Sequence, residues 1–296
     1  MRDVVELPGG RRASYLVVGE GRPAMLFAGG PGFAADYMLP DAELFADLLR
    51  SYLVDPHGSG QSSPPSSPAG YTPEGHARFY ETVRSALGLG EVTVLGHSFG
   101  AITGLVYCAL FPGSVSRYVC VAGSGLSAET SDAESERARE QWEAALGRHR
   151  GAPWYPEARD VLDSWTERVL ATDDPTEVDR MMGTVLPLYT AHPERPDVAE
   201  ALSVMRTYLT TDLAAAKAWE SGIYQSFDLR PLLSKIRCPT LVVAGEDDFI
   251  CGPAQARLLV EAIPASRLVL IPDCGHLAMF EKEAEFVEAV TRFCAG

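Results

Sequence analysis

One pentapeptide, the Gly-x-Ser-x-Gly at residues 96–100, constrains the fold of this chain more than any other stretch. Apolar and β-branched residues precede it at 92–95, and an apolar segment without a helix breaker follows it at 101–111. This pattern predicts a buried strand that reverses sharply into a helix, with Ser98 at the corner. The glycines leave room for the reversal, and the hydroxyl is expected above the carboxyl end of a sheet. We interpret Ser98 as a nucleophile.

A serine hydroxyl is a weak nucleophile at neutral pH and needs a general base within hydrogen-bond reach. Of the six histidines, His276 follows the last predicted strand, residues 267–271, and therefore lies at the carboxyl edge of the sheet. His57 lies on another loop at that edge and is the second choice. His97 is expected to point away from the neighbouring Ser98. We predict His276 as the base.

An acid must orient the base, and in the chain order serine, acid, histidine it lies between the other two. Three consecutive acidic residues, 246–248, close the strand predicted at 238–245. Their carboxylates leave the sheet on the same edge as the serine. We favour Asp248 as the orienting acid, with Asp247 as the main rival.

The developing oxyanion needs two hydrogen-bond donors. One is the amide after the nucleophile, which belongs to Phe99. The other should come from the loop after an early strand, and residues 29–32 (GGPG) follow the short apolar strand at 24–28. Pro31 has no N–H to offer, so we predict the Gly30 amide as the second donor, with Gly29 next to the substrate.

Strands and helices alternate along most of the chain. Strands are predicted at 4–7, 13–19, 24–28, 52–55, 92–97, 117–122, 238–245 and 267–271, and helices at 37–50, 72–87, 101–111, 253–263 and from His276 to 293. Between 127 and 229 strand signals disappear, and prolines divide a helical pattern into short pieces. We predict an α/β core of residues 1–126 and 230–296 with a mostly parallel, eight-stranded sheet, and a helical cap subdomain at 127–229.

Composition sets broad limits on function. The 296 residues carry a formal net charge of −15, which disfavours nucleic acid and anionic membrane surfaces as partners. No run of about 18 apolar residues is present, and the first eight residues lack the apolar core of a signal peptide. The six cysteines are scattered. We expect a cytoplasmic protein without metal or other cofactor.

The motifs described above resemble, in their order, those of the α/β-hydrolase fold. They are GGPG at 29–32, DPHGSGQS at 55–62, GHSFG at 96–100, GEDD at 245–248 and GH at 275–276. The first two are similar to those of the proline iminopeptidase (prolyl aminopeptidase) subfamily. The chain departs from that subfamily at Ala28, where histidine is usual, at His57, where arginine is usual, and at Ala101, where glycine is usual.

The resemblance implies cleavage of an N-terminal aminoacyl amide through an acyl-enzyme, from a short peptide or small molecule with a free amine. Such a substrate needs a carboxylate for its α-ammonium group, because an unpaired buried cation is costly. Glu220 resembles in place a cap glutamate of the subfamily, and Trp219 beside it can wall the pocket; the alternative is that Glu220 is a solvated glutamate on a helix. Some members have a glutamate after the triad aspartate, but this chain has Phe249, which suits a more apolar acyl or leaving group.

Three interpretations of the function stay open on sequence alone. The first is the aminoacyl-amide hydrolase, with natural-product tailoring and a substrate-carrying protein among its settings. The second is a carboxylesterase or lactonase acting on a hydrophobic small molecule, which would be indifferent to a free α-amine. The third is a non-catalytic ligand-binding protein of the same fold, which the intact set of Ser98, His276 and Asp248 disfavours.

Overall fold

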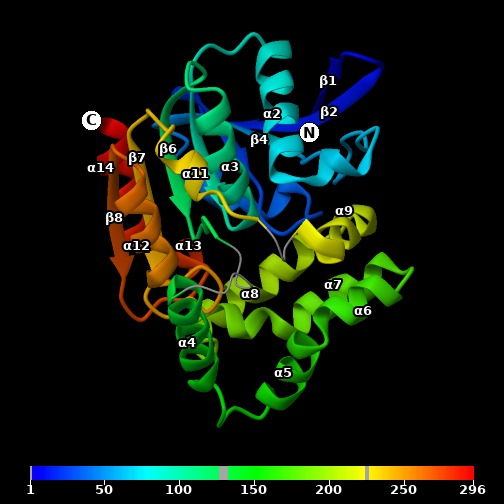
Figure 1. The fold of residues 1–296 in the computed structure, drawn as a ribbon, viewed down its shortest axis with the longest axis vertical. Coiled ribbons are helices and arrows are strands. Elements are labelled where there is room, and N and C mark those ends of the chain that lie inside the picture. The colour runs from blue at the N-terminus through cyan, green and yellow to red at the C-terminus, as the bar shows by residue number, and fades with distance from the viewer. Residues whose placement is uncertain (1, 127–132, 224–226) are drawn as a thin grey trace.

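A computed structural model describes residues 2–126, 133–223 and 227–296 (Figure 1). Its centre is an eight-stranded sheet with the strand order β1-β2-β4-β3-β5-β6-β7-β8. The strands are β1 (Asp3–Leu7), β2 (Arg11–Val18), β3 (Arg22–Phe27), β4 (Leu49–Val54), β5 (Val92–His97), β6 (Val115–Val121), β7 (Thr240–Gly245) and β8 (Ser266–Ile271). The pairs β1–β2 and β2–β4 are antiparallel and the rest are parallel. The predicted mostly parallel, eight-stranded sheet is confirmed.

Both faces of the sheet are covered, which explains why its central strands are apolar throughout. Successive residues of β5 point to opposite faces, so Val94 packs into one hydrophobic cluster and Leu95 into another. The Val94 cluster includes side chains of α2 (Pro73–Ala86), α3 (Phe99–Leu110), α11 (Arg230–Leu233) and α12 (Pro253–Ala262). The Leu95 cluster contains α1 (Leu39–Leu44) and α14 (Glu283–Ala295) and continues into the helices that follow β6.

In the connection from β6 to α11, which precedes β7, the described residues 133–223 form helices and no strand of the sheet. They are α4 (Ala133–Gly147), α5 (Tyr155–Asp163), α6 (Trp165–Ala171), α7 (Pro175–Val185), η3 (Leu186–Tyr189), α8 (Pro196–Tyr208), α9 (Leu213–Ala218) and η4 (Trp219–Ile223). Prolines begin α7 and α8. The N–H groups of a first helical turn have no acceptor within the helix, so the N–H that proline lacks costs no hydrogen bond there. These helices form the lower half of the molecule in Figure 1. Residue 127, the predicted start of the cap, lies outside the described residues, and the cap's independence from the core stays a prediction.

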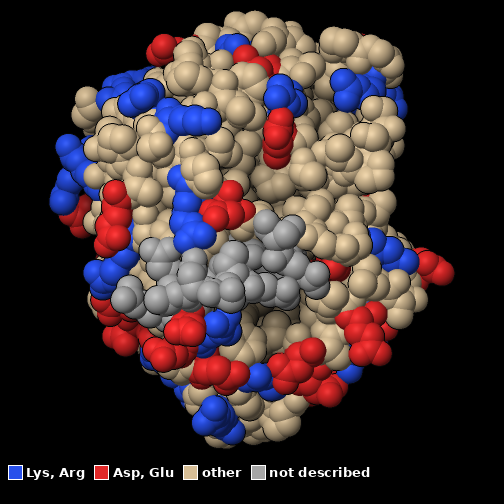
Figure 2. Space-filling model, in the orientation of Figure 1, with Lys and Arg blue, Asp and Glu red and all other residues tan. Residues whose placement is uncertain are grey.

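Acidic side chains gather on the outer surface of this helical region. Figure 2 shows Asp and Glu clustered over its lower part, in the area of α4 to α7. Residues 127–229 carry 20 Asp and Glu against 10 Lys and Arg, so this third of the chain holds most of the net negative charge. Within the described ranges, no helix combines the length and the apolar character needed to cross a membrane.

Two predicted helices differ from the structure. The helix expected at 37–50 is a 3₁₀ turn, η1 (Ala35–Met38), followed by α1, and the chain is already in β4 at Leu49. Leu49 pairs with Arg22 of β3, so sheet pairing overrides the helical pattern there. The closing helix is divided into α13 (Ala278–Glu281) and α14, because Lys282 has the non-helical dihedrals φ −140°, ψ 53°.

Candidate active site

Ser98 occupies the corner between β5 and α3. Its φ of +55° and ψ of −121° are unusual for a residue with a side chain, and such backbone strain costs about 1–3 kcal/mol. The corner is possible only because glycines flank it: a Cβ on Gly96 would lie 2.5 Å from the Gly100 carbonyl oxygen, and one on Gly100 would collide with the Phe27 carbonyl. The turn lifts the Ser98 hydroxyl off the end of the sheet.

The carboxyl-end loops of β7 and β8 bring Asp248 and His276 together. The Nδ1–H of His276 donates to Oδ2 of Asp248 over 2.8 Å, and both side chains are buried. The amides of Ile250 and Cys251 donate to the other oxygen, Oδ1, at 2.8 and 3.0 Å. Burial alone would raise the pKa of Asp248, but the adjacent His276 and these donors lower it below its usual range. Asp248 is therefore held as a carboxylate.

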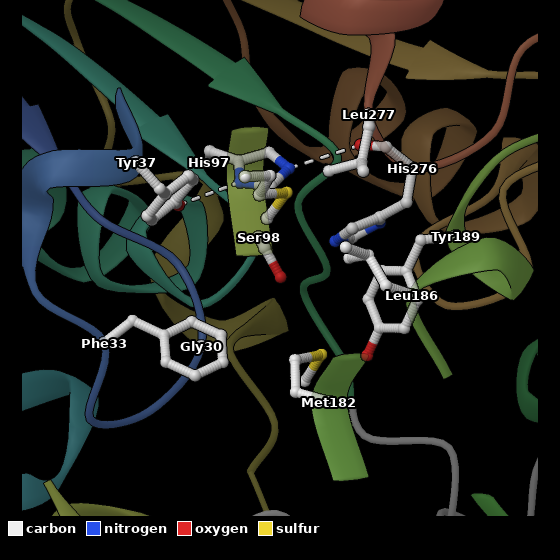
Figure 3. A pocket seen from close by; sticks show the side chains of 11 residues that line it. Gly30, Phe33, Tyr37, His97, Ser98, Met182, Leu186, Tyr189, His276 and Leu277 are labelled. Atoms are coloured by element: carbon white, nitrogen blue, oxygen red, sulfur yellow. Dashed lines mark hydrogen bonds between the residues drawn. The ribbon is translucent and has the colours of Figure 1, made fainter. Parts of the chain in front are cut away.

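This pairing fixes the tautomer of His276. With the proton on Nδ1, the other ring nitrogen, Nε2, is the one with a free lone pair. Nε2 is buried and has no hydrogen-bond partner among the described residues. In Figure 3 the His276 ring lies beside Ser98 and both face the same cavity. A buried basic nitrogen that has no other partner and shares a cavity with the hydroxyl makes His276 the candidate general base for Ser98.

The rival candidates have other contacts. The side chain of Asp247 forms an ion pair with Arg148 of the segment after α4. His57 stacks on Phe79 with 4.5 Å between ring centroids, and Nη1 of Arg11 lies 3.5 Å from Nε2 of His57. Neither Asp247 nor His57 lines the cavity that contains Ser98.

The two predicted oxyanion donors flank the serine. Gly30 lines the cavity, and its φ of +58° suits glycine; a Cβ there would come within 2.5 Å of the Phe33 ring. Phe99 is the first residue of α3, where helix amides lack an internal acceptor. Neither amide has a hydrogen-bond partner within the described part of the chain. The amide of Gly29, in contrast, donates to the Tyr37 hydroxyl at 2.5 Å.

A chain of hydrogen bonds links the loops that carry these groups. The Tyr37 hydroxyl lies 3.0 Å from Nδ1 of His97, and Nε2 of His97 lies 3.2 Å from the carbonyl oxygen of His276 (Figure 3). Because a carbonyl can only accept, His97 carries its proton on Nε2 and Tyr37 donates to Nδ1. Burial, followed by the nearby His276, lowers the pKa of His97 to about 3, so the ring is neutral. Sequence reasoning missed this role: the adjacency of His97 to Ser98 gave no sign of it.

The cavity in front of Ser98 has a volume of about 50 Å³. Its lining consists of Gly30, Phe33, Tyr37, His97, Ser98, Met182, Leu186, Tyr189, Met205, His276 and Leu277. None of these carries a carboxylate, an ammonium or a guanidinium group. Space for a few water molecules suits a small acyl group. The Ser98 hydroxyl points into this space in Figure 3.

The helical region after β6 contributes a large share of this lining. Met182 of α7, Leu186 and Tyr189 of η3 and Met205 of α8 face the loops of the sheet. The sequence singled out none of the four as a site residue. Helices with several apolar faces give no local signal of which one meets a cavity.

The predicted substrate-binding residues Trp219 and Glu220 of this region, and Phe249 of the loop after β7, lie outside the cavity lining. Trp219 packs edge-on against Phe99 with 4.9 Å between ring centroids. Glu220 is 8 % exposed and accepts hydrogen bonds from Trp165 Nε1 at 3.0 Å and Thr166 Oγ1 at 2.7 Å. Burial raises its pKa, although both donors oppose the shift. Phe249 contacts Tyr189, with 5.2 Å between their ring centroids.

The described residues contain no group of three or more His, Cys, Asp or Glu side chains arranged to hold a metal ion. The polar atoms at the site are instead those of a serine, two histidines, two tyrosines, a carboxylate and backbone amides. This set can carry out acyl transfer by proton shuttling and hydrogen bonding.

Comparison with known proteins agrees with this architecture. The family model described as "alpha/beta hydrolase fold" matches residues 25–283, which is most of the chain. The chain belongs to the alpha/beta hydrolase fold family. This confirms the resemblance stated from the motifs.

Members of this family similar to the chain include a proline iminopeptidase of Lactobacillus helveticus. It is 28 % identical over 294 residues, covering 94 % of this chain and 92 % of the relative. Among solved structures, an alpha/beta fold family hydrolase from Bacillus anthracis superposes with a TM-score of 0.78 at 17 % identity, covering 99 % of each chain. A thermophilic esterase from Thermogutta terrifontis gives a TM-score of 0.74 at 20 % identity, covering 100 % of this chain and 98 % of the other. The two structures establish likeness of fold.

Proposed function

We propose that this α/β hydrolase is a serine hydrolase that forms an acyl-enzyme on Ser98. One observation carries the proposal: the buried Nε2 of His276 has no partner among the described residues, its opposite nitrogen is bonded to Asp248, and it shares a cavity with the Ser98 hydroxyl. A buried imidazole left unsatisfied costs stability, so a functional reason for it is expected.

In the first half of the reaction, Nε2 of His276 removes the Ser98 proton while Oγ bonds to the substrate carbonyl carbon. The carbonyl π electrons move onto oxygen, and the amides of Phe99 and Gly30 stabilise that oxyanion. One such donor contributes about 3–4 kcal/mol in characterised hydrolases. When the oxyanion collapses, the bond to the leaving group breaks and His276 gives its proton to the departing amine or alcohol.

In the second half, water replaces serine. His276 takes a proton from the water, whose oxygen attacks the acyl carbon, and a second oxyanion forms at the same two amides. Collapse breaks the bond to Oγ, and His276 returns the proton to Ser98. Asp248 stays ionised throughout, since its low pKa matches a role in orienting His276 and stabilising its cationic form.

The bond proposed first is the amide of an N-terminal amino acid with a small apolar side chain. Support comes from the proline iminopeptidase relative, which aligns over almost the whole of both chains. Glu220 is the proposed partner of the substrate α-ammonium. Its neighbour Trp219 touches the oxyanion residue Phe99, and its carboxylate oxygens retain lone pairs after accepting one donor each. A cation beside this buried carboxylate would offset the cost of its charge.

A second candidate, hydrolysis of an ester or lactone with a small apolar acyl group, is favoured by a different observation. The lining of the cavity has no charged side chain, so nothing in it would neutralise an α-ammonium group. On this hypothesis Trp219, Glu220 and Phe249 support the walls of the cavity without touching the substrate.

The test uses prolyl- and alanyl-anilides, their N-acetylated forms and a short acyl ester of a chromogenic alcohol. The first candidate requires hydrolysis of the free-amine anilides only, and a rise in their KM in Glu220→Gln with little change in ester turnover. Hydrolysis of the ester irrespective of an amine supports the second. Ser98→Ala is the control, with an expected loss of at least about 10⁴-fold in kcat. If a serine-directed fluorophosphonate does not label the wild-type protein, both candidates are refuted and the interpretation as a non-catalytic binding protein remains.

A further inference from the structure

Glu281 is a buried carboxylate behind the proposed catalytic histidine that the reaction itself does not use. It ends α13, is 3 % exposed, and each of its oxygens accepts one backbone amide. Oε1 accepts from Gly275, the residue before His276, at 2.8 Å. Oε2 accepts from Ala191, in the segment that follows η3, at 2.7 Å. One side chain therefore bridges the histidine loop and the helical region.

A third hydrogen bond joins the same two segments. The amide of His276 donates to the carbonyl of Tyr189 at 2.7 Å, and Tyr189 lines the cavity. The segments also pack closely, since a Cβ on Gly275 would lie 2.5 Å from the Tyr189 carbonyl oxygen and 2.8 Å from Cα of Thr190. The backbone of His276 is thereby fixed on one side by Glu281 and on the other by Tyr189.

We propose that Glu281 is a positioning residue: its carboxylate holds the His276 loop against the 189–191 segment, so that Nε2 of His276 is aimed at Ser98. The inference rests on the proposed function, in which His276 is the base. It assigns Glu281 a task distinct from that of Asp248, which bonds the imidazole ring itself. A misplacement of about 1 Å in a catalytic group costs on the order of 10²-fold in rate.

The task calls for two acceptor oxygens. A glutamine at this position has one oxygen and one NH₂ group, and the NH₂ would face an amide donor, so one of the two bridges would be lost. Protonation of Glu281 acts in the same direction, because a hydroxyl oxygen of a carboxylic acid is a weaker acceptor for an amide N–H than a carboxylate oxygen, so one of the two bridges is weakened. The glutamine variant thus imitates the protonated wild type.

This equivalence gives the proposal a pH signature. Burial raises the pKa of Glu281 to about 7, partly opposed by the amides of Ala191 and Gly275. Asp248 after β7 raises this pKa further and His192 before α8 lowers it. Cys274 after β8, Arg195 before α8 and Lys282 next in the chain are the other charged or titratable groups near Glu281. The carboxylate form, with both bridges complete, predominates above that pKa, and the protonated form predominates below it.

The experiment compares wild type with Glu281→Gln from pH 5.5 to 9. Two rates are measured: kcat on a substrate from the panel above, and the second-order rate of Ser98 labelling by a fluorophosphonate. We expect the variant to be slower by about 10- to 100-fold at pH 8.5, with KM little changed. The ratio should approach one at pH 5.5, where wild-type Glu281 is itself protonated. Glu283→Gln, an exposed position that loses the same charge, is the matched control and should behave as wild type.

A ratio that stays constant across the pH range would show a merely structural role and overturn the proposal. Wild type that is not labelled at Ser98 would instead overturn the proposed function, so the two failures are distinguishable. Hydrogen exchange of the Gly275 and Ala191 amides in wild type tests the bridge even where the variant does not fold. After correction for intrinsic rates, their protection must increase between pH 6 and 8, and equal protection at both would contradict the proposal.

Discussion

The wall of the cavity built from the sheet loops contains most of its hydrogen-bonded side chains, whereas the wall built from the helices after β6 is mainly apolar. The first, the core wall, comprises Gly30, Phe33, Tyr37, His97, Ser98, His276 and Leu277; the second, the cap wall, comprises Met182, Leu186, Tyr189 and Met205. Hydrogen bonds with defined direction fix Tyr37, His97 and His276 of the core wall, while Met182, Leu186 and Met205 of the cap wall are held by packing. This contrast suggests that the core wall sets the rate of the reaction and the cap wall selects the acyl group.

The prediction with the largest effect concerns the core wall. Tyr37→Phe removes the hydroxyl that accepts from Gly29 and donates to His97. We expect kcat to fall by about 10- to 100-fold with KM nearly constant, because the oxyanion loop and the His276 loop lose their common anchor. Leaving buried groups unpaired should also cost about 1–3 kcal/mol of unfolding free energy. Steady-state kinetics and urea unfolding measure the two effects.

Tyr107→Phe is the matched control for that variant. The Tyr107 hydroxyl donates to Glu81 at 2.7 Å outside the cavity, so its loss should lower stability without changing kcat. If both variants reduce kcat equally, the effect belongs to global stability and the core wall has no special part in the rate.

A smaller effect, of a different kind, is expected from the cap wall. Met182→Ala enlarges the cavity. KM for short acyl substrates should therefore rise about tenfold and KM for longer acyl substrates should fall, with little change in kcat. A series of acyl esters or aminoacyl anilides of increasing length measures this shift. Val204→Ala, at an exposed position of α8 beside Met205, should leave the preference unchanged. An equal loss of kcat on every substrate would contradict the division between the walls.

The smallest effect on activity is expected at Asp41 of α1, which does not line the cavity. Its side chain is 1 % exposed, neither carboxylate oxygen has a partner within the described residues, and burial raises its pKa to about 8. The folded protein then keeps a proton that the unfolded chain releases above pH 4, so stability falls as the pH rises from about 4 to 8. Asp41→Asn removes this decrease of the unfolding free energy with pH, which is at most about 1.4 kcal/mol per pH unit.

Unfolding in urea at pH 5 and pH 8 checks this prediction. The advantage of the Asp41→Asn variant over wild type should be larger at pH 8, with kcat unaffected. A constant difference at the two values would mean that Asp41 is already ionised in the folded protein.

The core wall was more accessible to sequence reasoning than the cap wall. Ser98 and His276 of this wall, and Asp248 behind it, come at or shortly after the carboxyl ends of β5, β8 and β7, and parallel strands end at a common edge, so their proximity could be predicted. Met182 and Met205 lie on helices whose mutual packing decides which face meets the cavity. Tyr37 was predicted as the first residue of a long helix at 37–50. In the structure it lies instead in the 3₁₀ turn η1, and β4 has already begun at Leu49.

Glu220 and Glu281 show what sequence position alone leaves open. Both are acidic residues in helical segments, and both are buried with two donors each. Glu220 was singled out by its correspondence to the subfamily, while Glu281 had no distinguishing motif. The difference between them is what their donors belong to: side chains of α6 for Glu220, and the backbone beside His276 for Glu281.

All four cap-wall residues come from one uninterrupted segment, residues 182–205, between two strands of the sheet. The segment can therefore be exchanged as a single cassette without a change to any residue of the core wall. A replacement must preserve the carbonyl at position 189 and the amide at position 191, which meet the histidine loop, and the packing of the segment against the core. A library varied in this segment alone would explore new acyl specificities at constant chemistry, a separation useful both to an evolving lineage and to an enzyme engineer.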